Sequence, residues 1–255
     1  MDIYLSTIGK NAAVLAREYG FGLEIADFSY AANMDVDFEY WDELTRANLA
    51  GIERRIFHAP FNELCPAAVE PLVAEVTRRR LEQAYRLMLR YETNRMVVHS
   101  GYIPHLYDKG WFAERSAEFW RGFLLDKPAD FSLLLENVLE EGPDMLLDII
   151  KKTGDERFHF CLDLGHAGGH FSDLPPTAWI EKSAPHIRHV HIHNNYRRGD
   201  LHNPPGDGLV DIGAALSKIA KLCPNATYTL ETGDLPAAIS WILHFTDFQN
   251  CGKLS

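Results

Sequence analysis

The chain has 255 residues, enough for one medium-sized domain or two small ones to bury a hydrophobic core. Its formal net charge of −11 repels nucleic acid at a distance, which argues against a nucleic-acid partner but allows a phosphate held locally by metal. We expect no membrane insertion and a cytoplasmic protein, because no apolar run approaches the roughly 20 residues of a membrane span and MDIYLSTIGKNAA lacks signal-peptide features. The four cysteines form no CxxC pair, which favours reduced thiols, and the net negative charge favours a small-molecule ligand.

Short apolar runs alternate with longer segments of helical periodicity along the whole chain. Eight runs predict strands, beginning near residues 2, 22, 54, 95, 131, 159, 187 and 226. The segments between them predict helices over residues 10–19, 40–49, 67–91, 111–125, 143–153, 175–183, 211–221 and 235–245. Repeated βα units favour a parallel sheet, and eight of them match a (β/α)₈ TIM barrel. No linker or composition shift interrupts the pattern, so we expect a single domain over residues 1–255.

The longest predicted helix, residues 67–91, has apolar residues mostly at helical spacings. They are Val69, Leu72, Val73, Val76, Leu81, Ala84 and Leu87. This spacing is typical of an amphipathic helix that packs its apolar face against a core.

Six of the eight predicted strands end in residues that can bind metal. They are His58, His99, Glu136, Asp163 with His166, His191 with His193, and Glu231. In a TIM barrel the carboxyl ends of all strands share the face that carries the active site. A carboxylate or imidazole that ends a buried apolar run needs a partner to offset its desolvation, and shared cations supply one. The pattern therefore predicts a divalent-metal site at this face.

The seventh predicted strand and the loop after it add further donors. His189, His191 and His193 alternate, so all three point to one side of the sheet, where they cannot all bind metal directly, and we assign His193 to substrate binding. The loop DLHNPPGDG carries Asp200 and His202 on a segment that proline and glycine stiffen. Nitrogen and carboxylate donors without thiolate favour zinc or manganese, as one to three ions.

Glu24 ends the second predicted strand, and its pattern leaves two interpretations open: contact with substrate, or a structural ion pair. A single histidine is more often a structural residue than a ligand, so the metal site is predicted from the coincidence of strand ends. The histidines interpreted as ordinary packed or solvent-facing side chains are His105, His159, His170, His186 and His244.

Motifs along nearly the whole chain resemble the xylose isomerase-like TIM-barrel superfamily, which includes sugar epimerases, sugar-phosphate isomerases and endonuclease IV. The motifs are FHAPF, VVHSG, LLLENV, CLDLGHA, HVHIHNN, DLHNPPGDG and TLETG, in the family's order. The resemblance to the epimerases implies one metal ion held by Glu136, Asp163, His191 and Glu231. It also implies that the two glutamates act as acid and base, and that His166 and Arg197 bind substrate.

The resemblance extends to the three-zinc site of endonuclease IV, an AP endonuclease of family 2. The additional ligands of that site match His58, His99, His166, Asp200 and His202. The chain departs from the endonucleases in HAPFNEL, which replaces a tyrosine-bearing segment, and in ENVLEEG and LGHAGG. These departures and the negative charge argue against DNA repair.

Three functions are compatible with this pattern. The leading hypothesis is a metal-dependent isomerase or epimerase of a sugar or sugar phosphate, in which one glutamate removes a proton beside a polarised carbonyl and the other returns it. The alternative is a phosphoesterase with two or three metal ions, which the surplus donors His58, His99, Asp200 and His202 favour. A non-catalytic sugar- or metal-binding barrel ranks third, because it leaves both glutamates without a proton-transfer role. The pattern predicts no particular oligomeric state.

Overall fold

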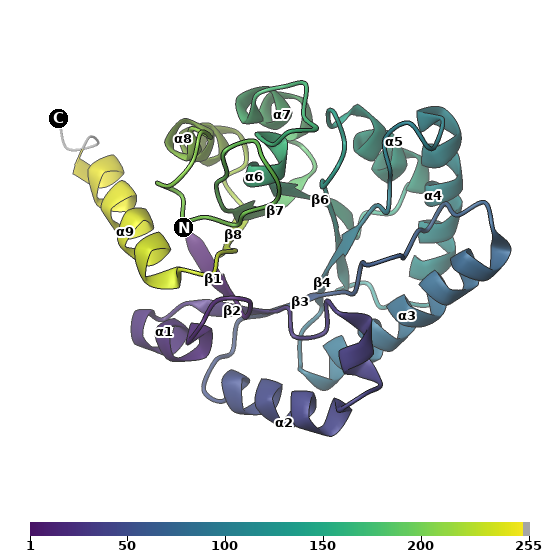
Figure 1. Ribbon diagram of the computed structural model, residues 1–255, viewed down its shortest axis with the longest axis horizontal. Helices are drawn as coiled ribbons and strands as arrows, with labels where there is room; N and C mark the ends of the chain where they lie inside the picture. Colours follow the sequence, from purple (N-terminus) through teal and green to yellow (C-terminus); the bar gives the residue numbers. More distant parts are fainter. Residues whose placement is uncertain (252–255) are drawn as a thin grey trace.

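The computed structural model describes residues 1–251, and within them eight parallel strands close into a barrel (Figure 1). The strands are β1 (Asp2–Ser6), β2 (Gly22–Ile25), β3 (Arg55–His58), β4 (Arg95–His99), β5 (Ser132–Glu136), β6 (Phe158–Asp163), β7 (Ile187–Ile192) and β8 (Thr227–Leu230). Neighbours in sequence pair with one another, and β8 closes the barrel against β1, where Leu230 lies opposite Leu5. The predicted TIM barrel is confirmed.

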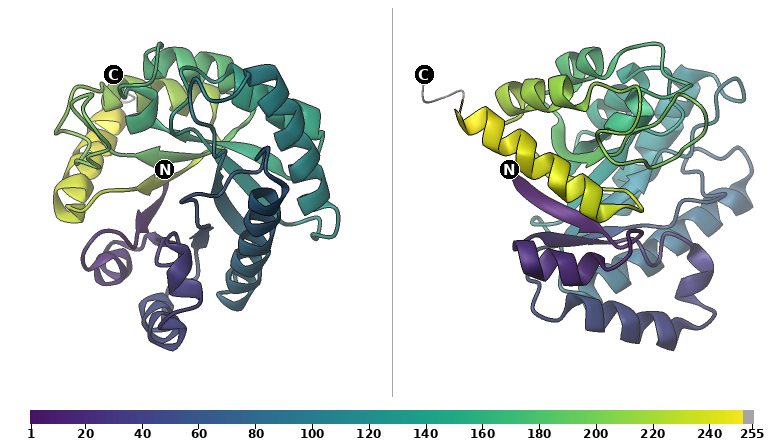
Figure 2. Two further views of the ribbon diagram at one scale, coloured as in Figure 1. Left: turned by 45° about the vertical axis from the view of Figure 1, so that its right-hand side comes forward. Right: turned by 60° about the vertical axis from the view of Figure 1, so that its left-hand side comes forward.

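Helices surround the closed sheet, as the views in Figures 1 and 2 show. The longer ones are α1 (Ala12–Tyr19), α2 (Phe38–Leu49), α3 (Pro71–Arg90), α4 (Lys109–Leu124), α5 (Asp144–Thr153), α7 (Pro176–Ser183), α8 (Ile212–Leu222) and α9 (Leu235–Cys251). Two short elements were not predicted, the 3₁₀ helix η1 (Ala31–Met34) and the one-turn helix α6 (Leu164–Ala167), because one turn is too short to show periodicity. Within residues 1–251, no helix is both long and apolar enough to span a membrane.

The apolar face predicted for α3 is wrong over its first turns. The helix begins at Pro71, where a proline loses no helical hydrogen bond, and the Glu70 carboxylate accepts from the Leu72 N–H at 3.1 Å. The apolar residues Leu72, Val73 and Val76 on these turns are exposed, as is Val69, which precedes the helix. The buried stripe consists of Thr77, Leu81, Ala84, Leu87 and Met88. Periodicity shows which residues share a face, but only the tertiary structure determines whether another element covers it.

The interior of the barrel contains an apolar layer beneath a polar one. The apolar layer is Tyr4, Ile56, Val97, Leu134 and Cys161, which pack together apart from the core between sheet and helices. Side chains two positions apart on a strand point to the same side, so the next inward residues of β3 to β6 are His58, His99, Glu136 and Asp163. Strand alternation thus places the predicted ligands directly above a buried apolar layer.

Asp42 is a buried carboxylate, 3% exposed, that joins α2 to the end of α3. It accepts two hydrogen bonds from the Arg90 guanidinium, each 2.7 Å long, and one from the Tyr91 hydroxyl at 3.0 Å. The hydrogen bonds from Arg90 hold the pKa of Asp42 below its ordinary value, although burial opposes this.

We expect Asp42→Asn to lower the free energy of unfolding by about 1–3 kcal/mol, because it leaves buried donors imperfectly paired. The contribution of a carboxylate with a lowered folded-state pKa is fully present above the unfolded pKa of about 3.9, and is lost as the pH falls through the folded value. Urea denaturation of wild type and variant, at neutral pH and in steps below about pH 4, measures both effects. A difference between the two proteins that stays constant on acidification would contradict the assignment.

Candidate metal centre

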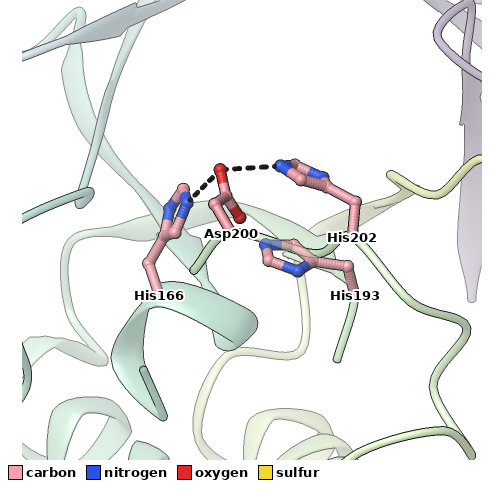
Figure 3. Close-up of side chains that lie close together, drawn as sticks. All are labelled: His166, His193, Asp200 and His202. Atoms are coloured by element: carbon pink, nitrogen blue, oxygen red, sulfur yellow. Dashed lines mark hydrogen bonds and ion pairs between the residues drawn. The ribbon is translucent and has the colours of Figure 1, made fainter. Parts of the chain in front are cut away.

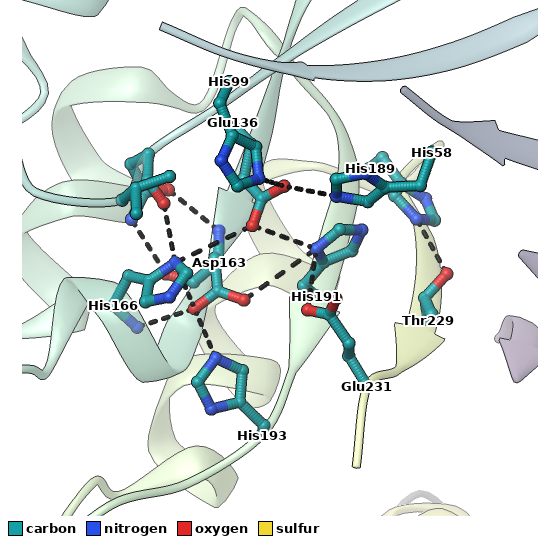
Figure 4. Close-up of polar contacts among 12 residues, drawn as sticks. His58, His99, Glu136, Asp163, His166, His189, His191, His193, Thr229 and Glu231 are labelled. Carbon is teal, nitrogen blue, oxygen red and sulfur yellow. Dashed lines mark hydrogen bonds and ion pairs between the residues drawn. The ribbon is translucent and has the colours of Figure 1, made fainter. Parts of the chain in front are cut away.

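Every residue predicted as a metal ligand lies in one of three groups at the carboxyl end of the barrel, and within each group the ligand atoms are within 4.8 Å of one another. The first group is Glu136, Asp163, His191 and Glu231; the second is His58, His99 and Glu136; the third is His166, His193, Asp200 and His202. Glu136 belongs to both the first and the second group, so these two are contiguous. Figure 4 shows the first two groups and Figure 3 shows the third.

His191 lies at the middle of the first group. Its Nδ1 is 3.1 Å from Glu231 Oε2, 3.2 Å from Glu136 Oε1 and 3.9 Å from Asp163 Oδ2. All four side chains are buried. Three carboxylates and one imidazole around a common point form a donor set suited to zinc or manganese.

The second group surrounds the other oxygen of Glu136. His58 Nε2 is 3.3 Å and His99 Nε2 is 3.2 Å from Glu136 Oε2. The ring of Phe61 stacks on His99 with a centroid separation of 4.2 Å. Glu136 is therefore held from two sides, with one oxygen toward His191 and the other toward the two histidines.

The third group is built around Asp200, from the loop between β7 and α8. Its Oδ2 lies 3.3 Å from His166 Nε2 and 3.0 Å from His202 Nε2, as the dashed lines in Figure 3 mark. His193 stacks on His202 with a centroid separation of 4.1 Å, and its Nε2 is 3.0 Å from Asp163 Oδ1. The third group thus adjoins the first through Asp163.

The helix α6 positions His166. Asp163 caps this helix by accepting a hydrogen bond from the His166 N–H at 2.6 Å. Asn137, directly after β5, exchanges hydrogen bonds with the Asp163 backbone at 2.8 and 3.1 Å. Gly165 is required here, because a Cβ at that position would overlap the ring of His193. Sequence reasoning did not identify Asn137 or Gly165, since neither can bind metal through its side chain.

Three of the imidazoles are oriented by backbone carbonyls. The Nδ1 atoms of His58, His166 and His202 each lie 2.9 Å from a carbonyl oxygen, those of Ala59, Asn137 and Glu231 respectively. A carbonyl only accepts, so each Nδ1 carries the hydrogen and each Nε2 faces its group. This is the arrangement in which histidine binds a metal ion.

The electrostatics of the groups fit a bound cation. Burial disfavours ionisation of Glu136, but His191 and His99 outweigh it and hold the pKa of Glu136 well below its ordinary value. Burial likewise opposes the charge of His191, yet the surrounding acidic groups hold its pKa well above the ordinary value. The pKa of His202 is raised to about 9, against burial, by Asp200 and Glu231. The raised pKa values of His191 and His202 favour their protonated forms beside the carboxylates, and a bound cation would compete with those protons.

Several buried atoms in the groups converge without forming a well-aligned hydrogen bond. They are Asp163 Oδ2, His166 Nε2, His191 Nδ1, both ring nitrogens of His193, and Glu231 Oε2. Buried polar atoms nearly always have a partner, so this concentration at one place calls for a further group. A divalent cation coordinates nitrogen and oxygen atoms that face a common point, and the residues present fit it.

The remaining predicted substrate-binding residues lie outside these groups. Arg197 is exposed in the loop after β7, and its Nε donates to the carbonyl of Gly168 at 3.2 Å. Glu24 has no exposed surface and lies 3.1 Å from His189 Nε2 and 3.0 Å from His191 Nε2. These two contacts fit the ion-pair interpretation of Glu24, and its contact with a substrate stays a prediction.

A cavity of about 360 Å³ opens beside the third group. His166 and Asp200 form part of its wall, and Val138, Leu139 and Phe171 form an apolar part. His170 also lines it and is exposed, in keeping with the expectation of a solvent-facing side chain. The volume falls in the range of small-molecule sites.

Comparison with known proteins identifies the family. Residues 15–245 match the family model described as xylose isomerase-like TIM barrel, and the chain belongs to this family. An uncharacterized protein of Methanocaldococcus jannaschii, MJ1311, is 25% identical over 197 residues. That match covers 72% of this chain and 66% of the relative, so the chain spans just under two thirds of the relative's length.

Solved structures share the fold. A D-tagatose 3-epimerase-like protein has a TM-score of 0.79 at 22% identity, with 100% of both chains covered. The TTHB071 protein of Thermus thermophilus, in crystals soaked with ZnCl2, has a TM-score of 0.73 at 23% identity, with 96% of this chain and 98% of that one covered.

Proposed function

We propose that this protein is a divalent-metal-dependent isomerase or epimerase of a sugar or sugar phosphate. The observation that carries the proposal is the placement of Glu136 and Glu231, whose oxygens lie 3.2 and 3.1 Å from the same nitrogen of His191. Two carboxylates beside one metal position suit a reaction in which one takes a proton from carbon and the other returns it. The fold shared with a protein named as D-tagatose 3-epimerase-like is consistent with this chemistry.

Glu136, Asp163, His191 and Glu231 would hold the ion, zinc or manganese. A cation bound there supplies a Lewis acid that polarises a substrate carbonyl and the adjacent hydroxyl, and so acidifies the C–H between them. Glu136 is ionised in this environment, as its lowered pKa indicates, and His58 and His99 fix its orientation. The apolar layer beneath the site excludes water from below, which strengthens these charge interactions.

The substrate would enter through the cavity beside the third group. His166 reaches both that cavity and Glu136, whose Oε1 is 3.7 Å from His166 Nδ1. We assign His166 and His193 to substrate contact at this border, and Arg197 to substrate contact from the loop after β7, part of which lines the cavity. In this assignment the apolar wall contacts carbon-bound hydrogens of the sugar, and the histidines contact its hydroxyl groups.

A phosphoesterase with two or three zinc ions is the second candidate. The presence of the second and third groups favours this function. Enolisation at a single ion leaves their residues His58, His99, Asp200 and His202 without a direct role. In that reaction the same side chains would hold several cations around a phosphate ester. The net charge of −11 favours a small phosphate compound over nucleic acid.

The test is a substrate screen with two readouts. Protein loaded with Mn²⁺ or Zn²⁺ is incubated in heavy water with free and phosphorylated ketoses, and in parallel with phosphomonoesters and phosphodiesters. We expect deuterium to enter at least one sugar at the carbon beside the carbonyl, detected by NMR, with no release of phosphate or alcohol from the esters. Ester hydrolysis without exchange would favour the second candidate, and neither reaction on any compound would contradict both.

A further inference from the structure

A buried polar network lies next to His191 on the side away from Glu136 and Glu231. It consists of Glu24 from β2, His189 from β7 and Thr229 from β8, each with no exposed surface. Figure 4 shows His189 and Thr229 beside His191. His189 also lies within 4.8 Å of ligand atoms of Cys161 and His191, but none of the three belongs to the groups around Glu136 or Asp200, so the network needs its own explanation.

Glu24 is the centre of this network. Its Oε2 accepts hydrogen bonds from the Thr229 hydroxyl at 2.5 Å and from His189 Nε2 at 3.1 Å. Its two oxygens lie 3.0 and 3.2 Å from His191 Nε2. The second nitrogen of His189, Nδ1, lies 2.7 Å from the Thr227 hydroxyl. The carboxylate is thus fixed in one rotamer by groups from two other strands.

The consequence for His191 follows from the chemistry of a carboxylate. An ionised carboxylate accepts hydrogen bonds and donates none, so Nε2 of His191 carries a hydrogen and Nδ1 is the atom that faces Glu136 and Glu231. The other oriented imidazoles, His58, His166 and His202, rest on neutral backbone carbonyls. A carboxylate is a stronger acceptor than a carbonyl, and it makes the opposite nitrogen a better metal ligand.

Stability alone does not account for Glu24. A buried ionic cluster is often no more stabilising than apolar residues of the same volume, because its charges must be desolvated. The barrel interior is apolar at neighbouring positions, such as Ile56 and Val97, where strands need no polar group. The buried carboxylate of Glu24, whose desolvation is unfavourable, lies directly behind the proposed ligand His191, which fits a role in orienting that ligand.

We propose that Glu24 is a positioning residue that, held by His189 and Thr229, keeps His191 turned with Nδ1 toward the metal centre and sets its affinity for a divalent cation. The inference rests on the metal centre of the proposed function, but not on which reaction that centre catalyses.

The test measures cobalt binding, not turnover. Wild type, Glu24→Gln and Asp42→Asn are titrated with Co²⁺, with the dissociation constant taken from competition with a chelator and the visible absorption spectrum recorded. Asp42→Asn is the matched control, since it removes a buried, hydrogen-bonded carboxylate far from the centre. We expect Glu24→Gln to bind Co²⁺ about 10–100-fold more weakly, with a changed absorption band, and Asp42→Asn to bind as wild type does.

Circular dichroism of the metal-free proteins establishes that each variant is folded. If Glu24→Gln does not fold, Thr229→Val tests the proposal in its place, because valine keeps the volume of the side chain and removes one hydrogen-bond donor to Glu24. Weaker Co²⁺ binding is again expected. Wild type that binds no Co²⁺ would overturn the metal centre and this inference together. If wild type binds Co²⁺ and the folded variant, Glu24→Gln or Thr229→Val, has the same dissociation constant and spectrum, only the role of Glu24 is overturned.

Discussion

Glu136→Gln and Glu231→Gln are each expected to slow the exchange of substrate hydrogen with solvent by about 10²–10⁴-fold, the range that general acid–base catalysis contributes. Glutamine keeps the size of each side chain but cannot take up the proton. The two residues share the environment of His191, so both substitutions should act on the same step. Deuterium incorporation in heavy water, followed by NMR with the sugar that the screen identifies, measures the effect.

Both glutamates are also proposed ligands, so metal content must be measured in each variant. A variant that retains its ion but loses exchange supports proton transfer by the replaced carboxylate. Glu141→Gln is the matched control, because Glu141 lies in the loop that follows Glu136 and pairs with Lys109 at 2.9 Å. Its exchange rate should equal that of wild type. Undiminished exchange in both Glu136→Gln and Glu231→Gln would refute the assignment of acid and base.

Removal of divalent metal by a chelator is expected to abolish turnover and to lower the unfolding temperature, and added Zn²⁺ or Mn²⁺ should restore both. A ligand that binds only the folded state stabilises it by about 2.7 kcal/mol when present at about 100 times its dissociation constant. The stabilisation is expected because a cation relieves the repulsion among the buried carboxylates Glu136, Asp163 and Glu231. Thermal unfolding at increasing concentrations of free metal measures this stabilisation. An unfolding temperature that does not depend on metal would contradict the proposed centre.

The number of bound ions separates the two candidate functions. One ion per chain is expected for the isomerase, and His99→Ala should then leave that ion in place, because His99 lies in the second group. Two or three zinc ions, one of which is lost together with turnover in His99→Ala, would instead favour the phosphoesterase. Elemental analysis of purified wild type and variant gives the count.

Much of the candidate site could be predicted from local sequence features. An apolar run that ends in His58, His99 or Glu136 indicates both a strand and its carboxyl end, and the period of two indicates which side chains share a face. The same local reasoning failed for the first turns of α3, where the apolar side chains of Leu72 and Val76 are exposed. It could not place His170 at the wall of a cavity, because such a wall has no periodic signal.

The sequence by itself determined the eight βα units, the residue types at their ends and hence the candidate metal ligands on one face, because these depend on patterns a few residues long. Only the tertiary structure decided which atoms meet. Glu24 and His191 are 167 residues apart, and the closure of the barrel brings them to hydrogen-bonding distance. The physical reason is that desolvation and hydrogen bonding depend on three-dimensional neighbours, so the orientation of His191 emerges only when the strands form a closed ring.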